Sequence, residues 1–298
     1  MMLIRAFEAA LLRREDHGFQ LLTSGQEAVS VGVCAALGES DQLLTSGRSI
    51  GPALARGLDP GRVMAELLGK STGPNRGKGG RGHLAEPVAG FFGAHAVIAG
   101  NLTIAAGVAL AAKCRARPIV VACMFGDGAC GAGALHESLN IAAVWKLPLL
   151  FVCDNNQYSV STPWREVLAP AQLSDIAKPF GVPGVTVDGM DVIAVRNSAR
   201  DLVDHVRQAG PAFLECVSFR FTPHSTSTGE TRSPAELRAA KARCPITQFT
   251  AHLRQTNALT AEQLATLGDE VAATVAAALH YADTSPFPDP AEALDDVV

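Results

Sequence analysis

The sequence lacks a Cys-x-x-Cys pair, although it contains seven cysteines. An odd number of scattered cysteines without metal-site spacing is typical of buried, reduced thiols in a cytosolic protein. The sequence also lacks an apolar run of about 18–20 residues, the length that a membrane-spanning helix needs. Residues 1–16 mix charge with helical periodicity and have no cleavage site, so we expect no signal peptide. These absences predict a soluble, cytoplasmic protein.

The sequence also lacks a strong excess of positive or negative charge. The 25 Lys and Arg residues nearly balance the 29 Asp and Glu residues, which leaves a formal net charge of −4. This balance argues against nucleic acid or an anionic membrane as the main partner. Apolar residues make up 48% of the chain, enough for an extensive core, and no internal repeat or flexible linker is present. We expect a single domain over residues 1–298 with an extended Pro-rich tail, SPFPDPAEAL.

Hydrophobic periodicity predicts the main elements. Two continuous apolar runs, residues 118–125 and 147–153, are typical of buried strands, and residues 131–145 between them have helical spacing. A strand, a helix and a strand in this order predict a βαβ unit with a parallel sheet. The remaining predictions are helices over residues 1–16 and 260–282 and from Gln26 onward, and a third strand over residues 212–217. The fold class is therefore α/β, with helices on both faces of a parallel sheet.

Residues 71–100 are rich in glycine and have few periodic apolar positions. Such a segment is either disordered or an ordered loop close to a ligand. Because it lies between helical segments in mid-chain, we favour the ordered loop.

The turn after the first apolar strand reads Gly126-Asp127-Gly128-Ala129-Cys130-Gly131. This matches the G-x-G-x-x-G pattern of dinucleotide-binding proteins, but that pattern alone has little specificity. It also brings an Asp to the place where a pyrophosphate anion would approach, which is unfavourable unless a cation lies between them. Asp127 is instead well situated to hold a metal ion that bridges to a diphosphate.

The second apolar strand ends in Asp154-Asn155-Asn156. Because adjacent parallel strands end side by side, Asp127 and Asn156 are expected at the same edge of the sheet. Carboxylate and amide oxygens are hard ligands that suit Mg²⁺. Backbone amides after Gly126 are expected to point at the diphosphate, and the glycines let the backbone approach it closely.

A family resemblance becomes specific at this point. The segment GDGACGAGALHESLNIAAVWKLPLLFVCDNNQYSVST resembles the α subunit of the thiamine-diphosphate-dependent pyruvate, branched-chain 2-oxo acid and acetoin dehydrogenase family. Further similarity covers nearly the whole chain, in TSGQEAVSVG, LLTSGRSIG, GKGGRGH, FRFTPHSTS and SPFPDPAEAL. The resemblance implies a thiamine-diphosphate-binding fold that uses thiamine diphosphate and Mg²⁺.

The resemblance also assigns roles to particular residues. Asp127, the Asn156 side chain and the Tyr158 main-chain carbonyl would ligate Mg²⁺. The remaining assignments are Gly126, Gly128, Ala129 and Arg48 at the diphosphate, Ala96 and Ile98 at the aminopyrimidine ring, and His224 as the catalytic histidine at the reactive end. For Asp127 and Asn156 the alternative is a helix cap and a turn residue; for Arg48 it is a surface ion pair, and for His224 a loop residue without a catalytic role.

Three features depart from the family pattern. Gly47 replaces a usual tyrosine, Ile50 replaces a usual histidine, and the loop after His224 reads STSTGE where an Asp commonly follows. These departures leave the metal site unaffected, but they bear on diphosphate affinity, loop order and substrate choice. Lys78 is interpreted as a solvated loop residue and His136-Glu137 as structural, whereas for His83 and His95 a structural role and a place in the pocket lining both stay open.

The resemblance implies that the chain acts on a small-molecule 2-oxo acid. In that chemistry the thiazolium ring accepts the electron pair left by departing carbon dioxide. The chain would need a β-type partner, as an α₂β₂ heterotetramer, and would pass the acyl group to an acceptor such as the lipoyl arm of an acyltransferase. Two alternatives remain open: half of a split transketolase-like or acyloin-forming ligase, and a degenerate, non-catalytic assembly subunit. A NAD dehydrogenase is disfavoured because it leaves Asn155-Asn156 unexplained.

Overall fold

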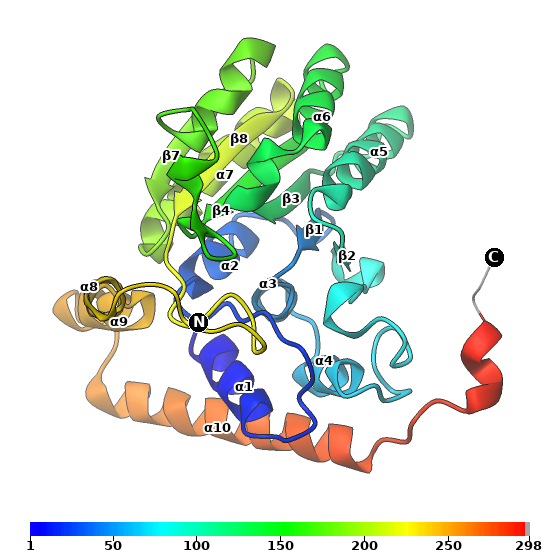
Figure 1. Ribbon diagram of the computed structural model, residues 1–298, viewed down its shortest axis with the longest axis vertical. Coiled ribbons are helices and arrows are strands. Elements are labelled where there is room, and N and C mark those ends of the chain that lie inside the picture. Colours follow the sequence, from blue (N-terminus) through cyan, green and yellow to red (C-terminus); the bar gives the residue numbers. More distant parts are fainter. Residues whose placement is uncertain (296–298) are drawn as a thin grey trace.

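The computed structural model describes residues 1–295 (Figure 1). Its strands are β1 (Gln42–Ser46), β2 (Phe91–His95), β3 (Val121–Gly126), β4 (Leu149–Asn155), β5 (Tyr158–Ser159), β6 (Thr162–Pro163), β7 (Gly184–Asp188) and β8 (Ala212–Val217). Its α-helices are α1 (Met2–Leu12), α2 (Glu27–Cys34), α3 (Ile50–Arg56), α4 (Pro60–Leu67), α5 (Gly100–Cys114), α6 (Gly133–Val144), α7 (Val192–Gln208), α8 (Pro234–Ala242), α9 (Pro245–Gln255) and α10 (Ala261–Thr284).

Six strands form one parallel sheet in the order β2-β1-β3-β4-β8-β7. In the central pair Val121 lies beside Leu149 and Gly126 beside Asp154, so β3 and β4 end together. Parallel strands buried on both faces are expected to be almost continuously apolar, which is why the runs in β3 and β4 were recognisable. The predicted βαβ unit is confirmed.

Helices cover both faces of the sheet (Figure 1), as the predicted fold class requires. Side chains at alternate positions of β3 point to opposite faces, because the side-chain period of a strand is two. Ala122 and Met124 join a core with α1, α2, α3, α4 and α7. Cys123 and Phe125 join a second core with α5, α6 and the 3₁₀ helix η5 (Leu173–Phe180).

The long helix α10 packs against α4 and α1, along the end of the molecule shown at the bottom of Figure 1. Thr260 and Gln263 form a capping box that starts this helix. After it, the Pro-rich tail runs without regular structure to Asp289. Because the Asp289 side chain then accepts a hydrogen bond from Ala291 N, Pro290–Leu294 form the 3₁₀ helix η6, where an extended segment was predicted.

The tail lies along the glycine-rich segment. Ser71 N donates to Pro286 O at 3.0 Å, Lys70 lies 3.7 Å from the Phe287 ring centroid, and Arg76 pairs with Glu292. The Pro-rich tail is therefore in contact with the rest of the chain. The assignment of residues 1–298 to a single domain stays a prediction.

Other predicted elements have shorter or shifted bounds. The N-terminal helix ends at Leu12 rather than residue 16, and the last helix extends to Thr284. The third predicted strand coincides with β8. All seven cysteines are free, and Cys114 alone among them is exposed. No helix among residues 1–295 is both long and apolar enough to cross a membrane.

Candidate active site

The carboxyl ends of β1, β3 and β4 open into a cavity of about 310 Å³. Ligand sites in open parallel sheets are expected at this edge. All ten residues selected from the sequence line this one cavity: Arg48, Ala96, Ile98, Gly126, Asp127, Gly128, Ala129, Asn156, Tyr158 and His224. They come from five separate stretches of the chain, so their convergence is a property of the fold.

Asp127 begins the short 3₁₀ helix η3 (Asp127–Gly131) directly after β3. Its side chain is 1% exposed, and within residues 1–295 no hydrogen bond reaches its Oδ2 atom. Burial raises the pKa of this carboxyl to about 6, although backbone hydrogen bonds and the charge of Arg220 oppose the shift. A buried carboxylate oxygen without a donor is costly, and a cation beside it would relieve that cost.

Asn156 follows β4 and is also buried. Its Oδ1 accepts hydrogen bonds from Tyr158 N at 3.3 Å and from Arg220 Nε at 3.1 Å. Between Asn156 and Tyr158 the chain turns at Gln157, whose φ of 75° lies in the left-handed region. This turn leads into the β5–β6 hairpin and brings Tyr158 to the cavity wall.

Gly128 lies where the hairpin approaches η3 most closely. A Cβ atom at this position would lie 2.6 Å from Ser159 Oγ, closer than real Cβ atoms come to other atoms. Glycine therefore lets η3 and the hairpin approach closely without displacing the Ser159 hydroxyl.

Arg48 is half-buried and follows β1. Its Nη1 donates to Leu22 O at 2.5 Å and its Nη2 to His224 O at 3.0 Å. Burial, followed by the nearby Arg220 cation, lowers the pKa of Arg48 to about 9. The side chain therefore ties an N-terminal segment to the His224 loop and contributes positive charge to the cavity, rather than forming a surface ion pair.

The glycine-rich segment is ordered around Glu66, a fully buried residue of α4. Glu66 Oε2 accepts from Asn75 N and Gly77 N at 2.9 Å each, and Oε1 accepts from Gly79 N at 2.8 Å and Gly80 N at 2.9 Å. One carboxylate thus replaces the regular hydrogen bonding that this segment lacks. The ordered-loop interpretation is confirmed, and the segment continues through β2 to the exposed side chains of Ala96 and Ile98 at the cavity.

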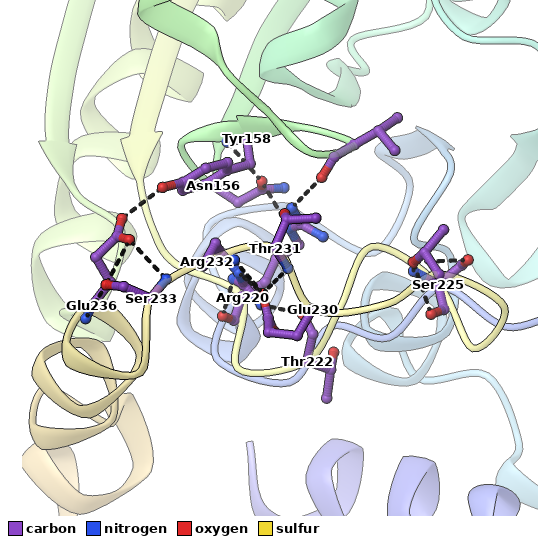
Figure 2. A network of polar contacts seen from close by, with 12 residues as sticks. Asn156, Tyr158, Arg220, Thr222, Ser225, Glu230, Thr231, Arg232, Ser233 and Glu236 are labelled. Atoms are coloured by element: carbon purple, nitrogen blue, oxygen red, sulfur yellow. Dashed lines mark hydrogen bonds and ion pairs between the residues drawn. The ribbon is translucent and has the colours of Figure 1, made fainter.

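The His224 loop follows β8 and is held by hydrogen bonds from Arg48 and Arg232, and Figure 2 shows those of Arg232. Arg232 donates to the carbonyls of Arg220 and Thr222 at 2.6 Å each, and its ion pair with Glu230 measures 2.7 Å. Burial, with the cations of Arg48, Arg220 and Arg81, lowers the pKa of His224 to about 4. His224 is therefore neutral near pH 7 and can accept or donate a proton through its ring nitrogens.

Figure 2 also shows how this loop meets the hairpin. The Tyr158 hydroxyl donates to Glu236 Oε1 at 2.6 Å, and this bond is the main cause that raises the pKa of Tyr158 to about 12. Glu236 also completes the capping box of α8 with Ser233. The start of α8 therefore supports the residue whose carbonyl is a predicted metal ligand.

Sequence reasoning missed three residues at the site. Arg220 is 1% exposed, its Nη2 donates to Val160 O at 2.8 Å, and its buried Nη1 has no partner within residues 1–295. Asp154 lines the cavity, and burial raises its pKa to about 7 despite a hydrogen bond from Ser218. Arg81 also lines the cavity. The sequence offered a signal for two of them. Arg220 lies between two Phe residues after a buried strand, and Asp154 directly precedes Asn155-Asn156.

Lys78, His83, His95, His136 and Glu137 are not among the residues that line this cavity, so the structural interpretation is favoured for the two histidines of the glycine-rich segment. His83 and His95 contact each other edge to face, with ring centroids 5.9 Å apart, and Lys78 Nζ donates to Glu292 O. His136 and Glu137 are exposed on α6. In the part of the chain that the structure describes, no three His, Cys, Asp or Glu residues form a metal-binding group. The predicted Mg²⁺ ligands are one carboxylate, one side-chain amide and one main-chain carbonyl, so they do not belong to such a group.

Comparison with known proteins gives a consistent result. Residues 1–291 match the family model described as the dehydrogenase E1 component. The α subunit of acetoin:2,6-dichlorophenolindophenol oxidoreductase from Bacillus subtilis is 37% identical, over 94% of this chain and 84% of that protein.

Two further relatives cover the entire chain. The pyruvate dehydrogenase E1 component α subunit from Rhizobium meliloti is 37% identical over 88% of its own length. The Cupriavidus necator acetoin:2,6-dichlorophenolindophenol oxidoreductase α subunit is 38% identical over 91% of its length. Because the family match and these relatives extend along almost the whole chain, the protein belongs to the dehydrogenase E1 component family, as the α-type subunit of a thiamine-diphosphate-dependent oxidoreductase that works with a β-type partner.

Proposed function

We propose that this chain binds thiamine diphosphate through Mg²⁺, and that with a β-type partner it decarboxylates a 2-oxo acid and passes the acyl group to an acceptor. The observation that carries the proposal is the convergence of all ten selected residues on one cavity, with the buried Asp127 Oδ2, which has no hydrogen-bond partner within residues 1–295, in its wall. When bound, thiamine diphosphate supplies an electron sink for the pair left by carbon dioxide.

Asp127, the Asn156 side chain and the Tyr158 carbonyl are the proposed Mg²⁺ ligands. The unpartnered Asp127 oxygen fits this role directly. Asn156 Oδ1 already accepts two hydrogen bonds, so coordination by this atom would replace the one from Arg220 Nε. Arg220 Nε would then lose its acceptor and, like Nη1, which has no partner within residues 1–295, would be available to donate a hydrogen bond.

Gly126, Gly128, Ala129 and Arg48 are the proposed contacts of the diphosphate. Gly128 leaves space that a Cβ atom would share with the Ser159 hydroxyl, and the Arg48 guanidinium has further N–H groups that make no hydrogen bond within residues 1–295. Ala96 and Ile98 would form the surface for the aminopyrimidine ring.

His224 is the proposed proton-handling residue at the reactive end. Its low pKa leaves the imidazole neutral near pH 7, so it can donate a hydrogen bond to a substrate oxygen or accept a proton during acyl transfer. His224→Ala in the assembled enzyme should lower kcat while cofactor affinity stays within twofold; unchanged turnover would rule out this role.

The test of the proposed function uses the chain purified with its β-type partner. Reduction of 2,6-dichlorophenolindophenol is measured with a panel of 2-oxo acids and with acetoin, in the presence and absence of thiamine diphosphate and Mg²⁺. Cofactor-dependent reduction with a 2-oxo acid supports the proposal. A lipoyl acyltransferase added in place of the dye tests whether that acceptor is used, and sedimentation of the complex tests α₂β₂ assembly.

Two other outcomes favour the alternatives. Cofactor-dependent consumption of the 2-oxo acid and an aldehyde, without dye reduction, would indicate an acyloin-forming ligase. Cofactor binding without consumption of any substrate would indicate a non-catalytic assembly subunit.

A further inference from the structure

Arg81 is a cation of the cavity wall to which neither the family motifs nor the proposed metal and diphosphate contacts give a role. Its guanidinium is held in place by Nε, which donates to Phe19 O at 3.0 Å, and by Nη1, which donates to Gly47 O at 3.2 Å. Its main-chain carbonyl accepts a hydrogen bond from Ser49 Oγ at 2.6 Å. Both the backbone and the side chain of Arg81 are therefore oriented before any ligand binds.

The third nitrogen of this guanidinium, Nη2, has no partner among the described residues. No carboxylate among these residues forms an ion pair with Arg81. The charge lies over the Phe19 ring, 4.4 Å from its centroid, and partial burial lowers the pKa of Arg81 from its ordinary value. A fixed, partly desolvated guanidinium without a counter-ion is suited to bind a carboxylate.

Arg81 also acts on His224. Its cation, together with those of Arg48 and Arg220, lowers the pKa of His224. Arg81 and His224 line the same cavity, so a carboxylate bound to Arg81 would lie in the cavity that contains His224.

Gly47 leaves space beside this cation. A Cβ atom at Gly47 would contact only Leu21 Cδ1, at 3.8 Å, so the volume above Gly47 is open. The φ of 78° at this glycine orients the carbonyl that accepts from Arg81. An open space with a positioned cation at its wall is a suitable place for the anionic end of a small substrate.

We propose that Arg81 is a specificity-determining residue that binds the carboxylate of a 2-oxo acid and thereby favours this substrate class over uncharged acyloins. The inference rests on the proposed function, because it supposes that the substrate enters this cavity.

The test compares two substrates that differ in charge, pyruvate and acetoin, in the assembled α and β complex. Arg81→Gln should lower kcat/KM for pyruvate by about 10- to 100-fold, mainly through KM, since a charge-assisted hydrogen bond is lost. In the same variant, kcat/KM for acetoin and the dissociation constant of thiamine diphosphate should both stay within twofold of those of the unsubstituted complex. Arg81→Lys, which keeps the charge without the fork, should recover part of the pyruvate activity.

Arg165→Gln is the matched control. Arg165 is also stacked on an aromatic ring, 4.4 Å from the centroid of Trp164, but it is exposed and does not line the cavity. This variant should leave kcat/KM for pyruvate and for acetoin unchanged.

Three results would overturn the proposal: an equal loss for pyruvate and acetoin, weaker thiamine diphosphate binding with unchanged KM for pyruvate, or no change at all. Should the unsubstituted complex turn over neither substrate, the proposed function fails and Arg81 is judged by binding alone. Saturation-transfer NMR then compares pyruvate binding to the original complex and to Arg81→Gln. Binding lost in the variant supports the inference, and equal binding refutes it.

Discussion

The two sides of the cavity wall are built in different ways. Asp127 and Asn156 lie directly at the ends of two adjacent strands, so the register of the sheet brings them together. Arg48, Arg81 and His224 lie on loops that are distant in sequence and are held by side chains that bond to main-chain carbonyls. The first side depends on the core of the sheet, whereas the second depends on a few polar contacts. Substitutions should therefore affect the two sides differently.

The largest effect is expected at the strand-end side. Asp127→Asn removes the charge of the proposed metal ligand, so Mg²⁺-dependent affinity for thiamine diphosphate should fall about 100-fold or more, roughly 3 kcal/mol. The same change should stabilise the cofactor-free protein by about 1–3 kcal/mol, because it removes a buried charge whose Oδ2 atom has no donor among residues 1–295. Calorimetric titration and urea unfolding measure the two effects. Weaker cofactor binding together with a less stable protein would mean that Asp127 is a structural residue.

Glu66→Gln tests the loop side. An amide nitrogen cannot accept the hydrogen bonds that one oxygen of Glu66 now receives from two loop amides, so the variant should lose about 2–4 kcal/mol of unfolding free energy. Urea unfolding measures this loss, and limited proteolysis should detect new cleavage within residues 73–85.

The exposed Glu137→Gln on α6 is the control for this change and should leave stability within about 0.5 kcal/mol. Unchanged stability of Glu66→Gln would show that the glycine-rich segment is ordered by other contacts.

His224 gives the smallest effect and a characteristic pH dependence. Burial and the cations of Arg48, Arg220 and Arg81 lower its folded-state pKa to about 4. Between pH 6.5 and 4 the unfolded chain therefore binds a proton that the folded chain does not, and stability falls as the pH decreases. His224→Asn removes this penalty and should gain about 1 kcal/mol at pH 4.5 relative to pH 7.5, after allowance for solvent screening.

Thermal unfolding at the two pH values measures this difference. The exposed His280→Asn on α10 should not reproduce it. A larger gain at pH 7.5 than at pH 4.5 would contradict the lowered pKa.

By itself the sequence determined the central βαβ unit and the residues at its strand ends, because continuous apolar runs and strand-end polar residues are local signals. The same signals failed for β1, β2 and β7, which have five residues each and are not buried along their whole length. Burial pattern in these strands depends on what packs against them, and periodicity within five residues carries too little information.

The loop side of the cavity was decided by tertiary structure. The resemblance singled out Arg48 and His224, but their mutual contact, the role of Glu66 as the anchor of the glycine-rich segment, and the places of Arg81 and Arg220 follow from contacts between segments distant in sequence. A charged residue in a loop has the same local sequence whether it is solvated or bonded to a distant carbonyl. Its burial and its partners are set only when the chain folds, and these decide whether it becomes a site residue or a surface charge.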